Sequence, residues 1–220
     1  MGDEISTSHF SKKDFTRFES RLREETALLE EWFAEQRFAQ ESPKGGFELE
    51  AWIVDQDCQP APINEQFLEK AADAMVVPEL ARFNVEFNGQ PRSLNGDVFT
   101  AMRNELRATW DRAKKVAQSL SSELVMTGIL PTVQEDELTL ANMSSMERFR
   151  ALNEQVLRLR KGQPLNLDIQ GHDVLHIEHN DVMLESAATS FQIHLQMTQD
   201  QSVRIYNAAQ ILSAPMVAAS

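Results

Sequence analysis

The sequence contains almost no cysteine: Cys58 is the only one among 220 residues. A single cysteine excludes an internal disulfide and a zinc cluster held by several thiolates. It lies in residues 55–62, a stretch with two prolines that we expect to form a loop, and no histidine is close to it in sequence. A chain without disulfides suits a reducing compartment, so we expect the protein to be cytoplasmic.

Positive charge is also scarce. The chain has 21 Lys and Arg residues against 34 Asp and Glu residues, which gives a formal net charge of -13. Nucleic-acid backbones and anionic lipid surfaces are bound by clustered Lys and Arg, and no such cluster is present. We therefore expect neither a nucleic acid nor a membrane as a partner.

Long apolar runs are absent as well. The first ten residues, MGDEISTSHF, have neither the basic start nor the apolar core of a secretory signal. No later run reaches the roughly 20 apolar residues that span a bilayer. Internal repeats, low-complexity segments and Pro- or Gly-rich linkers are missing too.

Several familiar catalytic motifs cannot be found. The sequence has no Gly-rich phosphate loop, no G-x-S-x-G elbow and no H-E-x-x-H. His172, His176 and His179 are close together, but their spacing fits no zinc template, and we expect them to lie on a surface hairpin.

What is present is the composition of a globular protein, with 42% hydrophobic and 25% charged residues. A chain of 220 residues can bury one sizeable core. We therefore expect a single domain over residues 1–220, with a helical segment over 1–44 and a sheet with helices over 45–220.

Apolar periodicity predicts alternating helices and strands. We expect Asn64 to cap a helix, and Ser144 or Ser145 to cap another. Strands arranged in hairpins and pairs, with long helices between them, are typical of an α+β fold. Such a fold would pack its helices on one face of a largely antiparallel sheet and leave the other face free. The expected helices are 12–38, 64–75, 95–124, 144–159 and 199–218, and the expected strands are 45–55, 82–87, 165–170, 174–178 and 189–198.

The strand-like segment from Gly45 to Asp55, GGFELEAWIVD, places two acids on one face. Glu48 and Glu50 are two residues apart, so their side chains project from the same side of a strand. Carboxylates this close repel each other unless one takes up a proton or a cation neutralises both. A divalent metal with oxygen ligands would resolve the repulsion, and a solvated acidic sheet surface is the alternative.

Two other strands offer polar groups opposite an apolar face. The first, residues 82–87, turns Glu86 to its polar side, and the strand 189–198 does the same with Gln192, His194 and Gln196. Each residue alone fits an ordinary polar sheet surface. Together with Glu48 and Glu50, however, they supply acids, amides and an imidazole that can hold metal-bound phosphate.

Four segments together resemble the glutamate-cysteine ligase family, in particular its second, bacterial type of carboxylate-amine ligases. GGFELEAWIVD is similar to the family's G-x-E-x-E strand, and FNVEFNGQP resembles its next acidic strand. MERFRALNEQV and VMLESAATSFQIHLQM resemble a later segment that ends in a strand with a histidine on the phosphate side. The resemblance extends roughly from Gly45 to Ser220 and does not include the helix before Gly45.

The resemblance implies a glutamine-synthetase-like fold, whose curved antiparallel sheet holds ATP and its divalent metals on the concave face. Glu48, Glu50 and Glu86 match the positions of metal ligands for Mg²⁺ or Mn²⁺. His194 matches the catalytic group that lies beside the ATP phosphates and a metal.

The resemblance also implies residues that bind ATP or substrate. Gln192 and Gln196 share the strand face of His194. Arg148 falls where the family has an Arg-Tyr pair, and Arg150 follows two residues later. Here Phe149 replaces the tyrosine, so the hydroxyl contact of that pair is missing.

The reaction that the resemblance implies is the ATP-dependent joining of the γ-carboxylate of glutamate to a small molecule that bears an amine, through a glutamyl phosphate intermediate. Phosphoryl transfer between two anions requires neutralised charge and fixed geometry more than a protein nucleophile, and metal-binding carboxylates suit that requirement. The sequence stops within a helical pattern at residues 218–220, so we expect a truncated chain that lacks turnover by itself and can form a homo-oligomer.

Two alternatives to a ligase stay open. One is a phosphotransferase of the related guanidino-kinase fold, which would require a reactive cysteine close to the phosphate site. The other is a non-catalytic relative that keeps the fold for binding or assembly, which loss of one of the three glutamates would favour.

Overall fold

A computed structural model describes residues 3–219 of the chain. These residues form two compact units. Unit 1 comprises residues 3–9, 47–89 and 101–192, and unit 2 comprises residues 10–46, 90–100 and 193–219. The single domain expected over 1–220 stays a prediction, and its residues 1, 2 and 220, including the expected point of truncation, lie outside the described residues.

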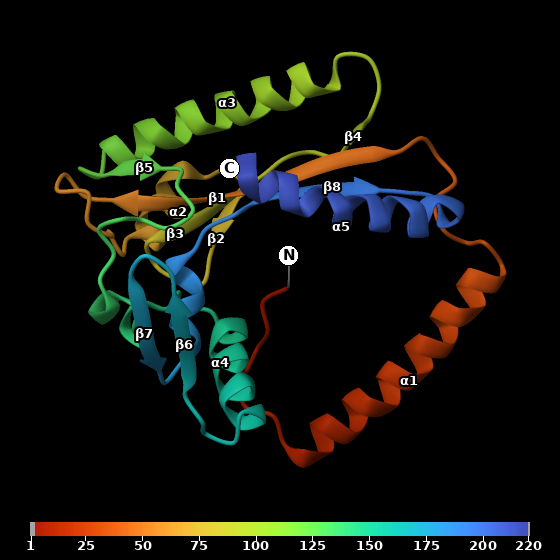
Figure 1. The fold of residues 1–220 in the computed structure, drawn as a ribbon, viewed down its shortest axis with the longest axis horizontal. Helices are drawn as coiled ribbons and strands as arrows, with labels where there is room; N and C mark the ends of the chain where they lie inside the picture. The colour runs from red at the N-terminus through yellow and green to blue at the C-terminus, as the bar shows by residue number, and fades with distance from the viewer. Residues whose placement is uncertain (1–2, 220) are drawn as a thin grey trace. The chain divides into compact units, whose positions relative to one another are not determined.

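The chain folds as an α+β protein (Figure 1). Its helices are α1 (Lys12–Ala34), α2 (Asn64–Ala71), α3 (Val98–Gln118), α4 (Glu147–Leu159) and α5 (Ser202–Ala219). Its strands are β1 (Lys44–Val54), β2 (Val76–Pro78), β3 (Asn84–Asn88), β4 (Arg92–Ser93), β5 (Glu123–Val125), β6 (Leu165–Gln170), β7 (Val174–His179) and β8 (Phe191–Gln196). Four short 3-10 helices are η1 (Glu135–Glu137), η2 (Leu140–Asn142), η3 (Val182–Ala187) and η4 (Gln199–Gln201).

The sheet of unit 1 is built around β1. Strand β3 lies between β2 and β1, and β5 pairs with the end of β1; each of these pairs is antiparallel. The register places Glu50 opposite Glu86 on β3, and Val77 of β2 opposite Glu86 on its other side. At the start of β8, the Glu50 N–H donates to the Ser190 carbonyl at 2.9 Å.

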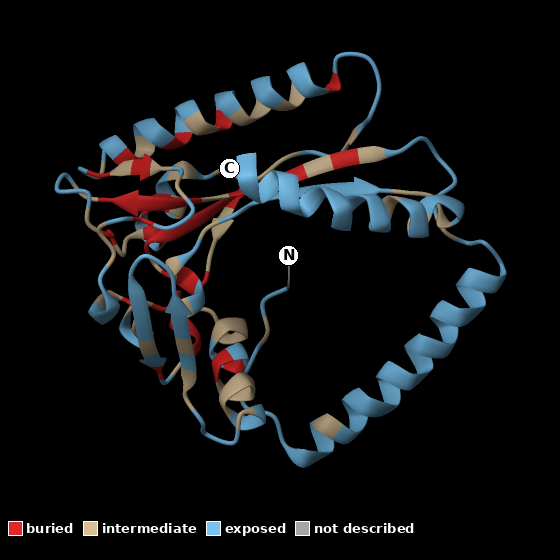
Figure 2. Ribbon diagram, in the orientation of Figure 1, coloured by how far each residue is buried: buried red, intermediate tan, exposed pale blue. Residues whose placement is uncertain are grey.

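One face of this sheet packs on α2 and α3. The alternate β1 residues Leu49, Ala51 and Ile53 point to this face, as the sequence pattern predicts. They join Val85 and Phe87 of β3 in a buried cluster, and Figure 2 shows this sheet as a largely buried layer. The helices contribute Phe67, Ala113 and Ala117, with Leu106 and Trp110 at the margin.

The opposite face is covered too, which corrects the expectation that helices pack on one face only. Trp52 and Val54 lie on the same face as Glu48 and Glu50 and need apolar cover of their own. The Trp52 ring stacks on Phe83 at a centroid distance of 5.3 Å. This second cluster is completed by residues around η3 and by α4 side chains, namely Val182, Met183, Phe149 and Val156. Among the described residues, this second cluster covers the Trp52 and Val54 end of the face, whereas Glu48 and Glu50 are half-buried.

Residues 165–179 form the hairpin that the sequence predicts. Strands β6 and β7 pair antiparallel, with Leu167 opposite Ile177 and Asp168 opposite His176. His179, at the end of β7, is buried, and its Nδ1 lies 3.1 Å from Asp181 Oδ1. This histidine supports the turn after the hairpin.

Unit 2 contains α1, the start of β1 paired with β4, the later part of β8, and α5. Ser11 and Asp14 form a capping box at the start of α1, since the Ser11 side chain accepts from the Asp14 N–H and the Asp14 carboxylate accepts from the Ser11 N–H at 2.8 Å. Gln199 Nε2 donates to the Phe33 carbonyl at 3.1 Å, which ties η4 to the end of α1. None of the helices within residues 3–219 is both long enough and apolar enough to cross a membrane.

Candidate functional site

Three carboxylates converge on the partly open face of unit 1. Oxygen atoms of Glu50, Glu79 and Glu86 all lie within 4.8 Å of one another. Glu50 and Glu86 meet because they are directly opposite in the antiparallel pair of β1 and β3, where facing side chains share one side of the sheet. Glu79 follows β2, the neighbour of β3 on the other edge. Strands β1 and β3 and the residue directly after β2 therefore contribute one acid each.

Neighbouring donors hold two of these carboxylates in place. Glu50 accepts hydrogen bonds from the Ser190 N–H and hydroxyl, both at 2.9 Å, and from Gln192 Nε2 at 3.2 Å. Glu86 is only 4% exposed and accepts from Asn88 Nδ2 at 2.8 Å. Uncharged donors therefore hold both side chains in place.

Glu79 has the most perturbed environment of the three. Burial above all, together with the nearby carboxylates of Glu50 and Glu86, raises the pKa of Glu79 to about 7. The Leu80 N–H, which donates to Glu79 Oε2 at 2.9 Å, opposes that rise because it stabilises the charged form. A carboxyl with this pKa carries a proton about half of the time at neutral pH. Partial protonation of Glu79 therefore reduces the repulsion among the three carboxylates, and a bound cation would reduce the same repulsion.

Two residues expected to cap helices instead fix the backbone that carries Glu79. Ser144 donates through its hydroxyl to the Glu79 carbonyl, and its N–H donates to the Leu80 carbonyl at 2.9 Å. Asn64 is fully buried, and its Nδ2 donates to Ser144 Oγ at 2.9 Å and to the Ala81 carbonyl at 3.3 Å. The structure gives neither α2 nor α4 a side-chain cap, because both side chains point inward to the 79–81 segment.

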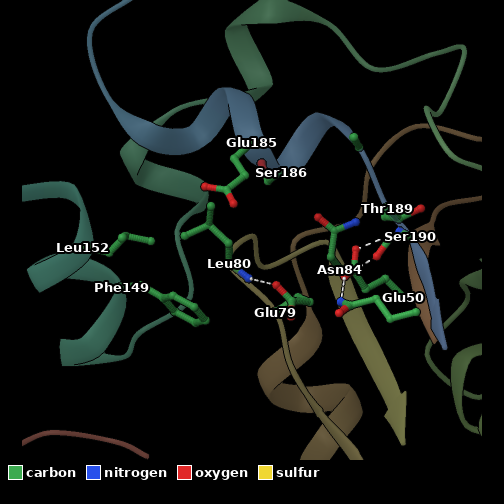
Figure 3. A pocket seen from close by; sticks show the side chains of 12 residues that line it. Glu50, Glu79, Leu80, Asn84, Phe149, Leu152, Glu185, Ser186, Thr189 and Ser190 are labelled. Carbon is green, nitrogen blue, oxygen red and sulfur yellow. Dashed lines mark hydrogen bonds between the residues drawn. The ribbon is translucent and has the colours of Figure 1, made fainter. Parts of the chain in front are cut away.

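A cavity of about 400 Å³ adjoins the three acids (Figure 3). In this view Glu50 and Ser190 lie on one side of it, Phe149 and Leu152 project from α4 on the other, and Glu185 points in from η3. None of the described lining residues is a Lys, Arg or His. The full lining consists of Glu50, Glu79, Leu80, Asn84, Phe149, Leu152, Glu185, Ser186, Ala188, Thr189, Ser190 and Gln192.

The structure brings some of the expected strand residues to this cavity. Glu50 and Gln192 line it, and Glu86 belongs to the adjoining acid cluster. Glu48 lies two residues before Glu50 on β1, opposite Asn88. It shares the strand face of Glu50 but is not a member of the three-acid group.

His194 and Gln196 belong to unit 2. They follow Gln192 at alternate positions of β8, so all three share one face of that strand. Both side chains are exposed. Their expected roles beside the ATP phosphates stay predictions.

The two arginines expected to bind substrate lie at the start of α4 and are not among the residues that line the cavity. The guanidinium of Arg148 stacks over the ring of Phe149, 4.6 Å from the ring centroid. Arg150 pairs with Glu147 and lines a separate cavity of about 290 Å³ that also includes Ser144. Of this segment, Phe149 is the residue that reaches the cavity beside the acids.

Glu79 is the site residue that sequence reasoning missed. It follows Val76-Val77-Pro78, a strand of only three residues that carries a proline and no alternating pattern. Its place in the cluster depends on the pairing of β2 with β3, which no local pattern encodes. The one available signal was an isolated acid immediately after a short apolar run.

The three acids suit a divalent cation. Mg²⁺ and Mn²⁺ prefer hard oxygen ligands, and three convergent carboxylates with one raised pKa form a site that a cation would stabilise. Cys58 is exposed in a turn and is not among the residues that line the cavity, so the cysteine that a guanidino-kinase site requires is not found there.

Comparison with known proteins identifies a protein family. A family model described as glutamate-cysteine ligase family 2 matches residues 45–220, which include β1 and every residue of the acid cluster. No curated protein and no solved structure matches the chain.

Proposed function

The chain belongs to glutamate-cysteine ligase family 2, and from that premise we propose that it serves as an ATP-dependent carboxylate-amine ligase acting on the γ-carboxylate of glutamate. Membership of this family supports the general assignment as a ligase. The convergence of Glu50, Glu79 and Glu86 is the observation that supports the specific reaction proposed here. ATP-dependent activation of a carboxylate requires positive charge beside the phosphates, and a cation held by these three acids would supply it.

In this proposal the three acids hold Mg²⁺ or Mn²⁺. When bound there, the ion would supply positive charge to the phosphate oxygens of ATP. Ser190 and Gln192 keep Glu50 directed at the cluster, and Asn88 does the same for Glu86. Glu48, two residues from Glu50 on the same strand face, is the candidate for a further ligand. His194 and Gln196 are candidates for the ATP phosphates because the family resemblance places them there.

The cavity beside the acids supports a small-molecule substrate. Its volume of about 400 Å³ lies in the range of small-molecule sites. Carboxylates, amides and hydroxyls line one part, and Leu80, Phe149 and Leu152 form an apolar wall. Glu185, which lines the cavity and is not one of the three acids, favours a ligand that carries an amine, which agrees with an amine acceptor.

A coupled assay tests the proposal on the protein expressed from its whole reading frame. We expect ADP release that requires glutamate, an amine from a panel of amino acids, and Mg²⁺ or Mn²⁺ together. Glu50→Gln should lower kcat/KM by at least about a hundredfold because one ligand is lost. Glu69→Gln, on the exposed side of α2, is the matched control. ADP release that is independent of glutamate, or unaffected by Glu50→Gln, would reject the proposal.

A further inference from the structure

Asn84 is a buried polar residue of β3 whose side chain has no partner within the described chain. Only 2% of the residue is exposed, and it lines the cavity beside the three acids. Among the described residues, neither its Nδ2 nor its Oδ1 has a hydrogen-bond partner. Buried side-chain amides are nearly always hydrogen-bonded, because an unpaired buried group lowers the stability of the fold. The amide of Asn84 therefore calls for a partner from outside the chain.

The backbone of Asn84 is fixed although its side chain is unpaired. Its N–H donates to the Ala81 carbonyl at 3.0 Å, and its own carbonyl accepts from Asn64 Nδ2 at 3.4 Å. Asn84 and Glu86 are two residues apart on β3, so they share one face of the strand. Figure 3 shows the Asn84 side chain extending from β3 into the cavity. A fixed backbone thus directs an unpaired amide into the cavity, which suits a preorganised binding group.

The other polar groups of the cavity lining leave a particular task to Asn84. The hydroxyls of Ser186 and Thr189 already donate to backbone carbonyls. Ser190 and Gln192 donate to a carboxylate of the acid cluster. None of the described lining residues is a Lys, Arg or His. A ligand oxygen that enters this cavity therefore finds its uncommitted side-chain donor at Asn84 Nδ2.

The chemistry of a carboxamide indicates what it can bind. It offers an acceptor oxygen and an NH2 group with two donors, so a ligand that satisfies both sides must bring a donor and an acceptor close together. The ammonium and carboxylate on the α-carbon of an amino acid form such a pair. Glu185, which lines the same cavity, adds a negative charge that favours the ammonium.

We propose that Asn84 is a specificity-determining residue of this site, and that its carboxamide binds the α-amino-acid head of a substrate. Oδ1 accepts a hydrogen bond from the ammonium group, and Nδ2 donates to the carboxylate. The assignment rests on the proposed function, because it takes the cavity beside the acids to be the substrate site. Glutamate and an amino acid that serves as the amine acceptor both carry such a head, and the experiments below distinguish the two.

Thermal unfolding without substrate tests whether the amide is unpaired, independently of any catalysis. Asn84→Leu keeps nearly the same shape and removes both unpaired groups. Replacing an unsatisfied buried amide by an apolar side chain of similar shape is expected to stabilise the ligand-free fold, as at other sites where function costs stability. We expect the midpoint to rise by a few degrees. A lower midpoint would show that Asn84 has a structural role and would overturn the proposal.

Steady-state kinetics in the coupled assay test the binding role. We expect Asn84→Leu to raise the KM of one amino-acid substrate by at least about tenfold, because the ligand head loses its partner. A raised KM for glutamate assigns Asn84 to glutamate, and a raised KM for the amine assigns it to the acceptor. Asn104→Leu, at an exposed position of α3, is the matched control and should change neither value. Unchanged KM values for both substrates in Asn84→Leu overturn the proposal.

Calorimetric titration separates this proposal from the ligase proposal, because it requires no turnover. Glutamate, the amino acids of the panel and their decarboxylated amines are each titrated into the original protein and into Asn84→Leu. We expect the original protein to prefer an amino acid over its decarboxylated amine, and Asn84→Leu to reduce that preference by at least about tenfold. This result supports the role of Asn84 even if no ADP is released. Absence of amino-acid binding, or an equal preference in both proteins, overturns the role of Asn84 even if ADP release confirms a ligase.

Discussion

At neutral pH, Glu79 is divided between its protonated and ionised forms, since burial and the carboxylates of Glu50 and Glu86 raise its pKa to about 7. Its pKa in the unfolded chain is near 4.5, so between pH 4.5 and 7 the folded state binds more protons than the unfolded state. The free energy of unfolding should therefore fall as pH rises through this window, by up to about 3 kcal/mol from this residue alone.

Chemical denaturation at pH 5 and pH 8, with a chelator present, measures this effect. Glu79→Gln removes the titrating group and should reduce the loss of stability between the two pH values, whereas the control Glu69→Gln should retain it. An unchanged pH dependence in Glu79→Gln would show that Glu79 does not titrate abnormally.

At the scale of elements, the segment 79–81 depends on a buried amide. Asn64, at the start of α2, donates to Ser144 Oγ and to the Ala81 carbonyl. Asn64→Ala would leave these acceptors without a donor in the interior, so we expect the free energy of unfolding to fall by about 2 kcal/mol or more. Gln66→Ala, on the exposed side of α2, is the control and should cost less than about 0.5 kcal/mol. Equal losses in urea denaturation would contradict the role given to Asn64.

Local patterns predicted the elements better than their pairing. Alternation in β1 and β3 predicted that Glu50 and Glu86 would turn away from the helix side of α2 and α3, because the period of two is a property of each strand. The register that sets Glu50 opposite Glu86, and the strand β2 that brings in Glu79, arise from contacts between distant segments. The role of Asn64 was mispredicted for the same reason. Its position in the sequence fits a helix cap, but its hydrogen-bond partner Ser144 is far away in sequence.

At the scale of the whole molecule, the mixture of helices and antiparallel strands was predictable, and family membership was recognisable from separated motifs. The cover of both sheet faces in unit 1 was not foreseen. Strand β1 ends in four consecutive buried residues, from Ala51 to Val54, and such a run requires apolar cover on both sides. The glutamine-synthetase-like curvature of the sheet stays a prediction.

The central claim is that Glu50, Glu79 and Glu86 together hold a divalent cation, and calorimetric titration of the whole chain with Mn²⁺ tests it most directly. We predict saturable binding to the original protein and to Glu69→Gln, accompanied by a higher midpoint of thermal unfolding because the cation binds only the folded state. Glu50→Gln and Glu79→Gln should each weaken the affinity by at least about tenfold. Absence of Mn²⁺ binding, or equal affinity in all four proteins, would contradict the claim.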